Sequence, residues 1–166
     1  MKLTINDLYD LSHSIAGDYL KKFTYPWEAL EGIKDLILEI QKSLSLDEYD
    51  KIKEDVFIAK DAVIYPNNYI AGPCIIGHKT EVRPGAFIRG SALVGDNCVV
   101  GNSTELKNVI LFDNVQVPHY NYVGRVLTAV AYDEPNEITI ASMKEAMTGK
   151  GEELDLSKWD EFIASL

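Results

Sequence analysis

The sequence predicts a mainly β protein, in which a left-handed parallel β-helix of about four coils follows N-terminal helices and precedes a short helical C-terminal tail. The first observation is a strict six-residue repeat, which neither the 3.6-residue period of a helix nor the two-residue period of a strand explains. Counted in steps of six, position one is Ile, Val or Leu nine times in succession: Ile58, Ile64, Ile70, Ile76, Val82, Ile88, Val94, Val100 and Leu106. A repeat of this length is typical of a parallel β-helix.

The second observation is that position five of the same hexads is mostly small. Its occupants include Ala62, Cys74, Thr80, Ala86, Ala92 and Cys98. We expect position one to point into a three-sided prism and position five to lie near its corners, where there is little room. Three hexads close one coil, so equivalent residues in successive coils lie about 4.8 Å apart. Cys74 and Cys98 are therefore interpreted as small core residues and not as a redox pair.

The third observation is a change of periodicity on both sides of the repeat. Residues 1–50 are expected to be helical, with Pro26 in a first helical turn and Ile33 and Ile37 on one apolar stripe. We interpret these helices as a lid on the core, although a direct role in ligand binding stays open. Residues 56–124 are assigned to the β-helix, and residues 125–166 to an irregular and helical tail. The tail contains "DLSKWDEFIASL", which is expected either to close the open end of the prism or to mark a shortened or altered version of a longer protein.

Composition excludes several classes of function. The net charge of −10 argues against nucleic acid or an anionic membrane as the main partner. The two cysteines lack metal-binding spacing, and no stretch approaches the roughly 20 apolar residues of a membrane span. We expect a cytoplasmic protein. The three histidines, His13, His78 and His119, do not favour the metal-dependent chemistry that other β-helices of this kind carry, so no metal site is expected.

The six-residue register slips after Leu106, because the next apolar positions are Leu111, Val117 and Val123. A slip changes which side chains reach the outside of the prism at that corner. The segments "ELKN" and "VPHYNYVG" lie there.

Polar residues from distant hexads are predicted to gather near one edge of the prism, over three successive coils. They are Arg83, Arg89, Glu105, Lys107, His119 and Tyr122. Several cations on an acidic protein indicate an anion site, and phosphate is the anion we expect there. The plain alternative is that the surface of a solenoid is polar everywhere, and this alternative is strongest for Arg89.

Three segments, "VRPGAFIRG", "GNSTELKN" and "VPHYNYVG", give a more specific indication. Together, over residues 56–124, they resemble the acetyltransferase half of the bifunctional glucosamine-1-phosphate acetyltransferase/N-acetylglucosamine-1-phosphate uridyltransferase enzymes, archaeal sugar-phosphate forms included. The resemblance implies that His119 is the general base and that Arg83 and Lys107 hold the sugar phosphate. It also implies that Tyr122 contacts the sugar and that Glu105 orients one of the cations.

The same resemblance implies acetyl-CoA as the acyl donor and a homotrimer with sites between subunits. The sequence also departs from the family pattern. Gly124 is followed by Arg125 where the family has Asp, no "GAGT"-like segment follows, and residues 1–50 lack the Gly-rich nucleotide loop of a uridyltransferase. Two hypotheses remain open: an acetyltransferase acting on an amino-sugar 1-phosphate or nucleotide sugar, or a non-catalytic domain that binds such a molecule or assembles a trimer.

Overall fold

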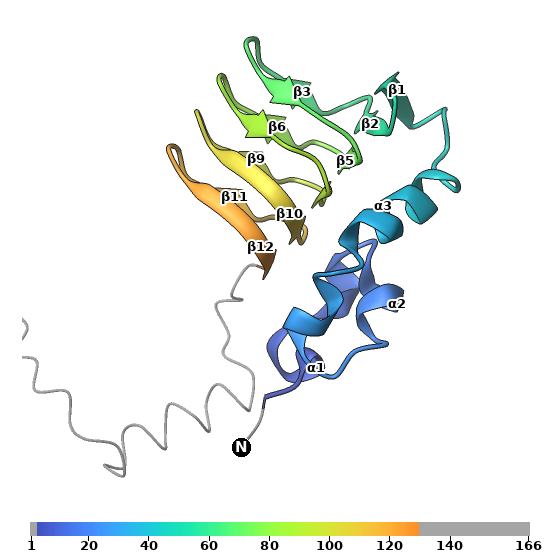
Figure 1. Cartoon of the computed structure of the whole chain (residues 1–166). Coiled ribbons are helices and arrows are strands. Elements are labelled where there is room, and N and C mark those ends of the chain that lie inside the picture. Colours follow the sequence, from blue (N-terminus) through green and yellow to red (C-terminus); the bar gives the residue numbers. More distant parts are fainter. Residues whose placement is uncertain (1–2, 130–166) are drawn as a thin grey trace, which may run out of the picture. The chain divides into compact units, whose positions relative to one another are not determined.

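Eleven short strands wind into a parallel β-solenoid of about four turns, shown in Figure 1. The computed structural model describes residues 3–129, so most of the predicted tail at 125–166 lies outside the described residues. The strands are β2 (Val56–Ala59), β3 (Val63–Ile64), β4 (Tyr69–Ile70), β5 (Cys74–Ile76), β6 (Glu81–Val82), β7 (Phe87–Ile88), β8 (Ala92–Val94), β9 (Val99–Val100), β10 (Glu105–Leu111), β11 (Gln116–Val117) and β12 (Tyr122–Thr128). The predicted fold class, a left-handed β-helix, is confirmed.

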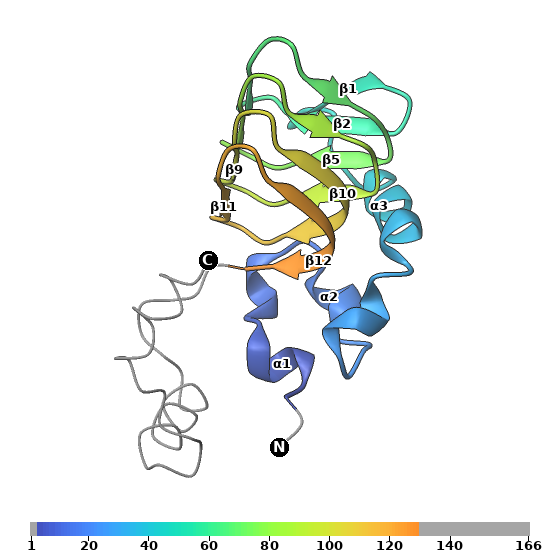
Figure 2. The same ribbon diagram turned by 60° about the vertical axis from the view of Figure 1, so that its left-hand side comes forward.

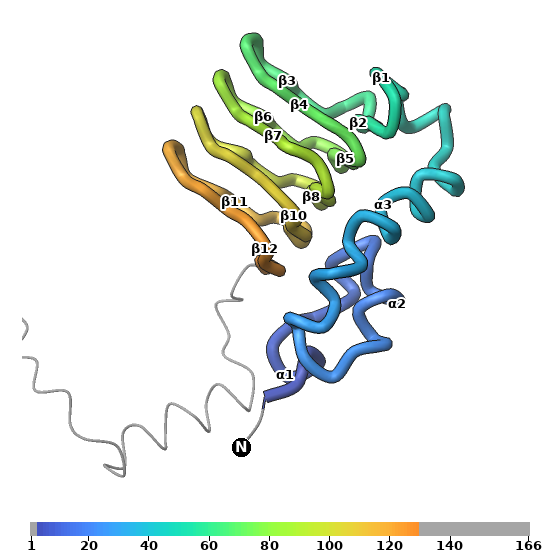
Figure 3. The backbone as a smooth tube through the Cα atoms, in the orientation of Figure 1, coloured from blue at the N-terminus to red at the C-terminus, as the bar shows by residue number. Residues whose placement is uncertain are grey.

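The strands form three faces, and Figure 3 shows the coils as successive rungs. Face A consists of β2, β5, β8 and the second parts of β10 and β12. Face B consists of β3, β6, β9 and β11, and face C of β4, β7 and the first parts of β10 and β12. Each strand is paired in parallel with its equivalent in the next coil, as Cys74 is with Val56 on one side and Ala92 on the other.

The predicted core is confirmed. Position one is buried from Ile76 to Leu106, whereas Ile64 is 36% exposed because it belongs to the first coil and nothing stacks above it. Position five is buried from Cys74 to Thr104, and its polar members are satisfied: the Thr80 hydroxyl donates to the Gly95 carbonyl oxygen at 2.7 Å. Cys74 is fully buried, and burial raises the pKa of its thiol to about 12, as expected of a core residue.

The register slips twice, not once. Three residues, 89–91, separate Ile88 on face C from Ala92 on face A. Only Lys107 and Asn108 fill the corresponding corner in the next coil, and only Gly124 and Arg125 in the coil after that. Because these corners are short, β10 and β12 run from face C to face A without a break and pair over their whole length.

The N-terminal segment forms α1 (Ile5–Leu8), η1 (Leu11–His13), α2 (Gly17–Leu20), η2 (Pro26–Ala29) and α3 (Ile33–Gln41). Helix α3 packs against β5, β8 and β10, and Figure 2 shows it beside this stack of strands. The outward row of face A is apolar and buried beneath this cover: Phe57, Ile75, Leu93, Ile110 and Leu127. Strand β1 (Tyr49–Lys53) pairs antiparallel with β2 and covers its free edge.

Residues 9–13 cover the end of the last coil. The Tyr9 ring stacks on Phe112 with centroids 5.3 Å apart, and its hydroxyl donates to the Leu127 carbonyl oxygen at 3.2 Å. The backbone N–H of Asp113 donates to the His13 carbonyl oxygen at 2.9 Å. In the preceding coils the equivalent N–H groups donate to an aspartate, as Asp96 does to the Asp113 carboxylate. The N-terminal segment thus supplies the acceptor that a further coil would provide. Among residues 3–129, no helix is long and apolar enough to cross a membrane.

Candidate functional site

Arg83 and His119 lie at the corner where face B turns into face C. Arg83 follows β6 and His119 follows β11, two coils further along. Successive coils are hydrogen-bonded here, since Arg83 N–H donates to the Val100 carbonyl oxygen and Gly101 N–H to that of Val117. The guanidinium of Arg83 lies 3.5 Å from the Glu81 carboxylate, with both side chains well exposed. Such an exposed pair contributes little to stability and leaves Arg83 accessible to a ligand.

Gly101 sets the position of His119. A Cβ at Gly101 would lie 2.5 Å from the backbone nitrogen of His119 and from the carbonyl carbon of Pro118. No real side chain fits at that distance, so the glycine allows the last coil to stack closely under the one before. The corner is fixed further by Asn121, whose amide donates to the carbonyl oxygens of Pro118 and His119.

The imidazole of His119 is exposed and lies perpendicular to the Tyr120 ring at 5.5 Å. Within residues 3–129 neither ring nitrogen forms a hydrogen bond or an ion pair. A free ring nitrogen suits a group that must accept a proton from a ligand. A histidine base is usually oriented by a second group, and the described part of this chain places none beside it.

Face C carries four of the other predicted residues. Glu105 pairs in register with Tyr122 in the coil below and with Phe87 in the coil above. Arg89 donates to the Glu105 carboxylate at 2.9 Å, and this hydrogen bond raises the pKa of the guanidinium. Glu105 therefore orients Arg89, which also lies 6.0 Å over the Phe87 ring.

Lys107 lies at the corner between faces C and A, level with Gly124 in the next coil. The phenol of Tyr122 folds over Gly124, because a Cβ there would lie 2.5 Å from the Tyr122 hydroxyl. The hydroxyl thus lies at this corner. The structure places Arg89, Glu105, Lys107 and Tyr122 together on face C and its edge with face A. Arg83 and His119 lie at the opposite edge of the same face.

Sequence reasoning did not assign Arg125 to the site. Its side chain is exposed at the same corner as Lys107, and its backbone has φ of 54°. The equivalent residue one coil earlier is Asn108, with φ of 55°. The sequence revealed the first register slip, after Leu106. It did not reveal the second slip, which places Arg125 at this corner.

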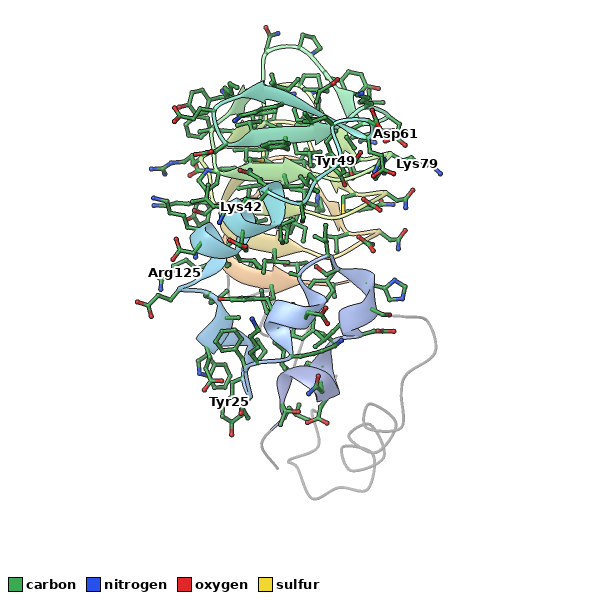
Figure 4. All side chains as sticks on the ribbon, turned by 90° about the vertical axis from the view of Figure 1, so that its right-hand side faces the viewer. Tyr25, Lys42, Tyr49, Asp61, Lys79 and Arg125 are labelled. Carbon is green, nitrogen blue, oxygen red and sulfur yellow. The ribbon has the colours of Figure 1, made fainter. Side chains whose placement is uncertain are left out.

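A histidine–carboxylate pair at the corner between faces A and B was also missed. His78 Nδ1 lies 2.9 Å from the Asp61 carboxylate, which also accepts the Lys79 N–H at 3.3 Å. The ring of Tyr49 is 5.1 Å from that of His78, and burial raises the Tyr49 pKa to about 12. Figure 4 labels Tyr49, Asp61 and Lys79 on this side of the solenoid. The spacing of about one coil between Asp61 and His78 is the signal that could have found the pair.

Two further features lie outside the predicted site. A cavity of about 560 Å³ opens at the first coil, between β1 and a floor formed by Ile58, Ile64 and Ile70, and none of the six predicted residues lines it. Among residues 3–129, no group of three or more His, Cys, Asp or Glu side chains is arranged to hold a metal ion.

Comparison with known proteins agrees with the solenoid fold. The family model described as bacterial transferase hexapeptide (six repeats) matches residues 55–90. Bifunctional protein GlmU of Methanococcus maripaludis is 35% identical over 108 residues, which are 64% of this chain and 26% of the relative. The protein of the same name from Methanocaldococcus jannaschii is 38% identical over 101 residues, 60% of this chain and 25% of the relative.

The corresponding protein of Brevibacillus brevis is 28% identical over 155 residues, covering 74% of this chain and 31% of the relative. The chain thus spans about a quarter to a third of the length of these curated relatives. These matches confirm the resemblance drawn from the three sequence motifs. Residues 55–90 thus match the bacterial transferase hexapeptide repeat, and the chain is similar to part of the GlmU proteins.

Proposed function

We propose that the chain is an acetyltransferase that transfers an acetyl group from acetyl-CoA to an amino-sugar 1-phosphate or the corresponding nucleotide sugar, with His119 as general base. The observation that carries this proposal is the placement of His119, whose ring nitrogens have no partner among residues 3–129, at one edge of a face whose other edge carries Lys107 and the Tyr122 hydroxyl. A base and an anion-binding edge on one accessible face are what such a substrate requires.

The proposed reaction is a direct transfer. The substrate amino group attacks the thioester carbonyl carbon, and His119 accepts the proton that the nitrogen loses. The carbon–sulfur bond then breaks, and the CoA thiolate leaves and takes up the proton from the imidazole. An imidazole titrates near neutral pH and can serve both steps. Lys107 holds the phosphate, Arg83 lies across face C at the edge that carries His119, Tyr122 contacts the sugar, and Glu105 positions Arg89.

We also propose a homotrimer that completes the site. Helix α3 covers face A, so faces B and C are the ones available for packing against other copies. Face C exposes aromatic side chains suited to burial at an interface, with Tyr69 54%, Phe87 40% and Tyr122 64% exposed. The neighbouring copy then supplies the group that orients His119. We place the protein in the cytoplasm, because Cys74 and Cys98 are both free thiols and acetyl-CoA is available there.

The second candidate is a binding or assembly domain without catalysis. It is favoured by the lack of any orienting group beside the His119 imidazole among residues 3–129. In that case face C binds the sugar phosphate, and no acyl donor binds to it.

Calorimetry separates the two candidates. Titration of acetyl-CoA into the protein, with and without glucosamine 1-phosphate, is expected to show donor binding. The sample with glucosamine 1-phosphate is expected to contain acetylated product afterwards. Binding of glucosamine 1-phosphate without any binding of acetyl-CoA would reject the enzyme and support the second candidate. Sedimentation of the same samples measures the trimer independently.

A further inference from the structure

Two exposed cations lie on adjacent coils at the edge between faces C and A. Lys107 is in register with Gly124, and Arg125 is the next residue. Since successive coils are about 4.8 Å apart, the backbones at Lys107 and Arg125 are close neighbours. Both side chains are exposed, and neither forms an ion pair within residues 3–129.

No carboxylate on the outward rows of face C neutralises this pair. Glu105 is the one acid in those rows of the described strands, and it is bound to Arg89 at 2.9 Å. Like charges without a counterion repel each other by about 1 kcal/mol at 4 Å even in water. The chain has a net charge of −10, so acids are plentiful elsewhere. An arrangement of this kind is relieved by a bound anion.

A third donor lies at the same edge. The Tyr122 phenol folds over Gly124, which brings its hydroxyl to the level of Lys107. An ammonium, a guanidinium and a phenol hydroxyl together suit the several oxygens of a phosphate group. Arg83, by contrast, lies across face C beside the corner that carries His119.

We infer that Lys107 and Arg125 hold the phosphate of the substrate, with the Tyr122 hydroxyl, so that Arg125 is a further substrate-binding residue. The substrate then lies across face C with its amino group toward His119. From His119 to Gly124 the extended chain spans at most about 17 Å, and the Lys107 and His119 side chains shorten this gap from both ends. The inference rests on the proposed function, and it fixes the orientation of the substrate on that site.

The test is calorimetric titration of Arg125→Asn with three probes: inorganic phosphate, glucosamine 1-phosphate and glucosamine. Asparagine removes the charge and keeps the left-handed backbone, as Asn108 does one coil earlier. Lys79→Asn is the matched control, because Lys79 is also a cation with φ of 55°, at the corner between faces A and B. Figure 4 labels Arg125 and Lys79 on opposite sides of the solenoid.

Arg125→Asn is expected to lower the affinity for glucosamine 1-phosphate and for inorganic phosphate by about tenfold, as the loss of a charge-assisted hydrogen bond does. Lys79→Asn should change neither, and Arg125→Lys should restore most of the affinity. Wild type should bind the sugar phosphate more tightly than inorganic phosphate, and glucosamine should bind equally to all variants.

If Arg125→Asn and Lys79→Asn change the affinity for the phosphate probes equally, the inference is overturned. This holds even if acetyl transfer by the wild type upholds the proposed function. Equal affinity for inorganic phosphate and the sugar phosphate would also overturn it, because the edge would then bind free phosphate only. A tenfold effect of Arg125→Asn without any acetyl transfer would retain the phosphate site and reject the enzyme.

Discussion

Faces A and C share one backbone repeat but have opposite outward rows. The outward residues of face A are apolar and no more than 8% exposed, because α3 and its neighbours cover them. The outward row of face C is open and consists of Tyr69, Phe87, Glu105 and Tyr122. The inward repeat therefore determines the fold, whereas the outward rows determine which face is packed and which face binds.

An aspartate placed on each of the two faces should produce the largest difference in unfolding free energy. Leu93→Asp puts an unpaired carboxylate beneath α3, and we expect it to cost roughly 4 kcal/mol or more of unfolding free energy. Tyr69→Asp on face C should cost no more than about 1 kcal/mol, because its side chain is already exposed to water. Urea unfolding of both variants at low protein concentration measures the difference. Similar losses would show that face A is not covered by the helices as described.

The covered region extends to the end of the solenoid, where Tyr9 packs on the last coil. Tyr9→Ala removes the stack on Phe112 and the hydrogen bond to Leu127, and we expect a loss of roughly 2 kcal/mol. Tyr9→Phe keeps the ring and should lose only about 1 kcal/mol. Unfolding by urea measures both. If Tyr9→Ala unfolds at the wild-type midpoint, residues 9–13 do not close this end.

Face C can be disturbed without loss of stability. In Gly124→Ala the new methyl group displaces the Tyr122 phenol, a flexible group that can move away. The unfolding free energy should change by less than about 1 kcal/mol, while affinity for glucosamine 1-phosphate falls by about tenfold. Calorimetry and urea unfolding on the same preparation give the two values. Unchanged affinity would place the sugar away from Tyr122.

The smallest expected effect is a pH dependence at Asp113, where burial raises the pKa of the carboxyl above its usual value. A raised pKa means that the ionised form is disfavoured in the folded state, so the native protein loses stability as the pH rises through it. Asp113→Asn should therefore be more stable than wild type by roughly a few tenths of a kcal/mol at pH 7, given the partial exposure of the group. The gain should shrink as the pH falls through the folded pKa of Asp113 and vanish below the pKa that the group has in the unfolded chain. Unfolding at several pH values tests the sign, and a variant less stable at pH 7 would contradict it.

The sequence predicted the inward side of the solenoid well. The residues from Ile76 to Leu106 carry a signal in every hexad, because each must fill the same narrow prism. The second slip was not predicted, because the inward position after Val123 is occupied by Thr128. The repeat is followed through Ile, Val and Leu, and a threonine does not continue that series. The cover on face A was not predictable from the six-residue period, which says nothing about outward residues such as Leu93.

The candidate site was predicted less completely, because its residues come together through coil stacking. Counting by coils places Lys107 and Tyr122 on adjacent rungs, and the structure has them there. Counting by coils does not reveal that Arg83 and Lys107 lie at opposite edges of face C, because that depends on the residue at which each corner turns. The Arg89–Glu105 pair and the bare imidazole of His119 depend on side-chain directions that no periodicity gives.

The most direct test of the acetyl-transfer site is thiol release from acetyl-CoA in the presence of glucosamine 1-phosphate. His119→Ala is compared with wild type and with His78→Ala, a histidine on the other side of the solenoid that is paired with Asp61. Loss of a general base should lower the rate by roughly a hundredfold or more. His78→Ala should keep the wild-type rate at a temperature where both variants are folded. Equal rates in wild type and His119→Ala, or no thiol release by wild type, would contradict acetyl transfer at face C.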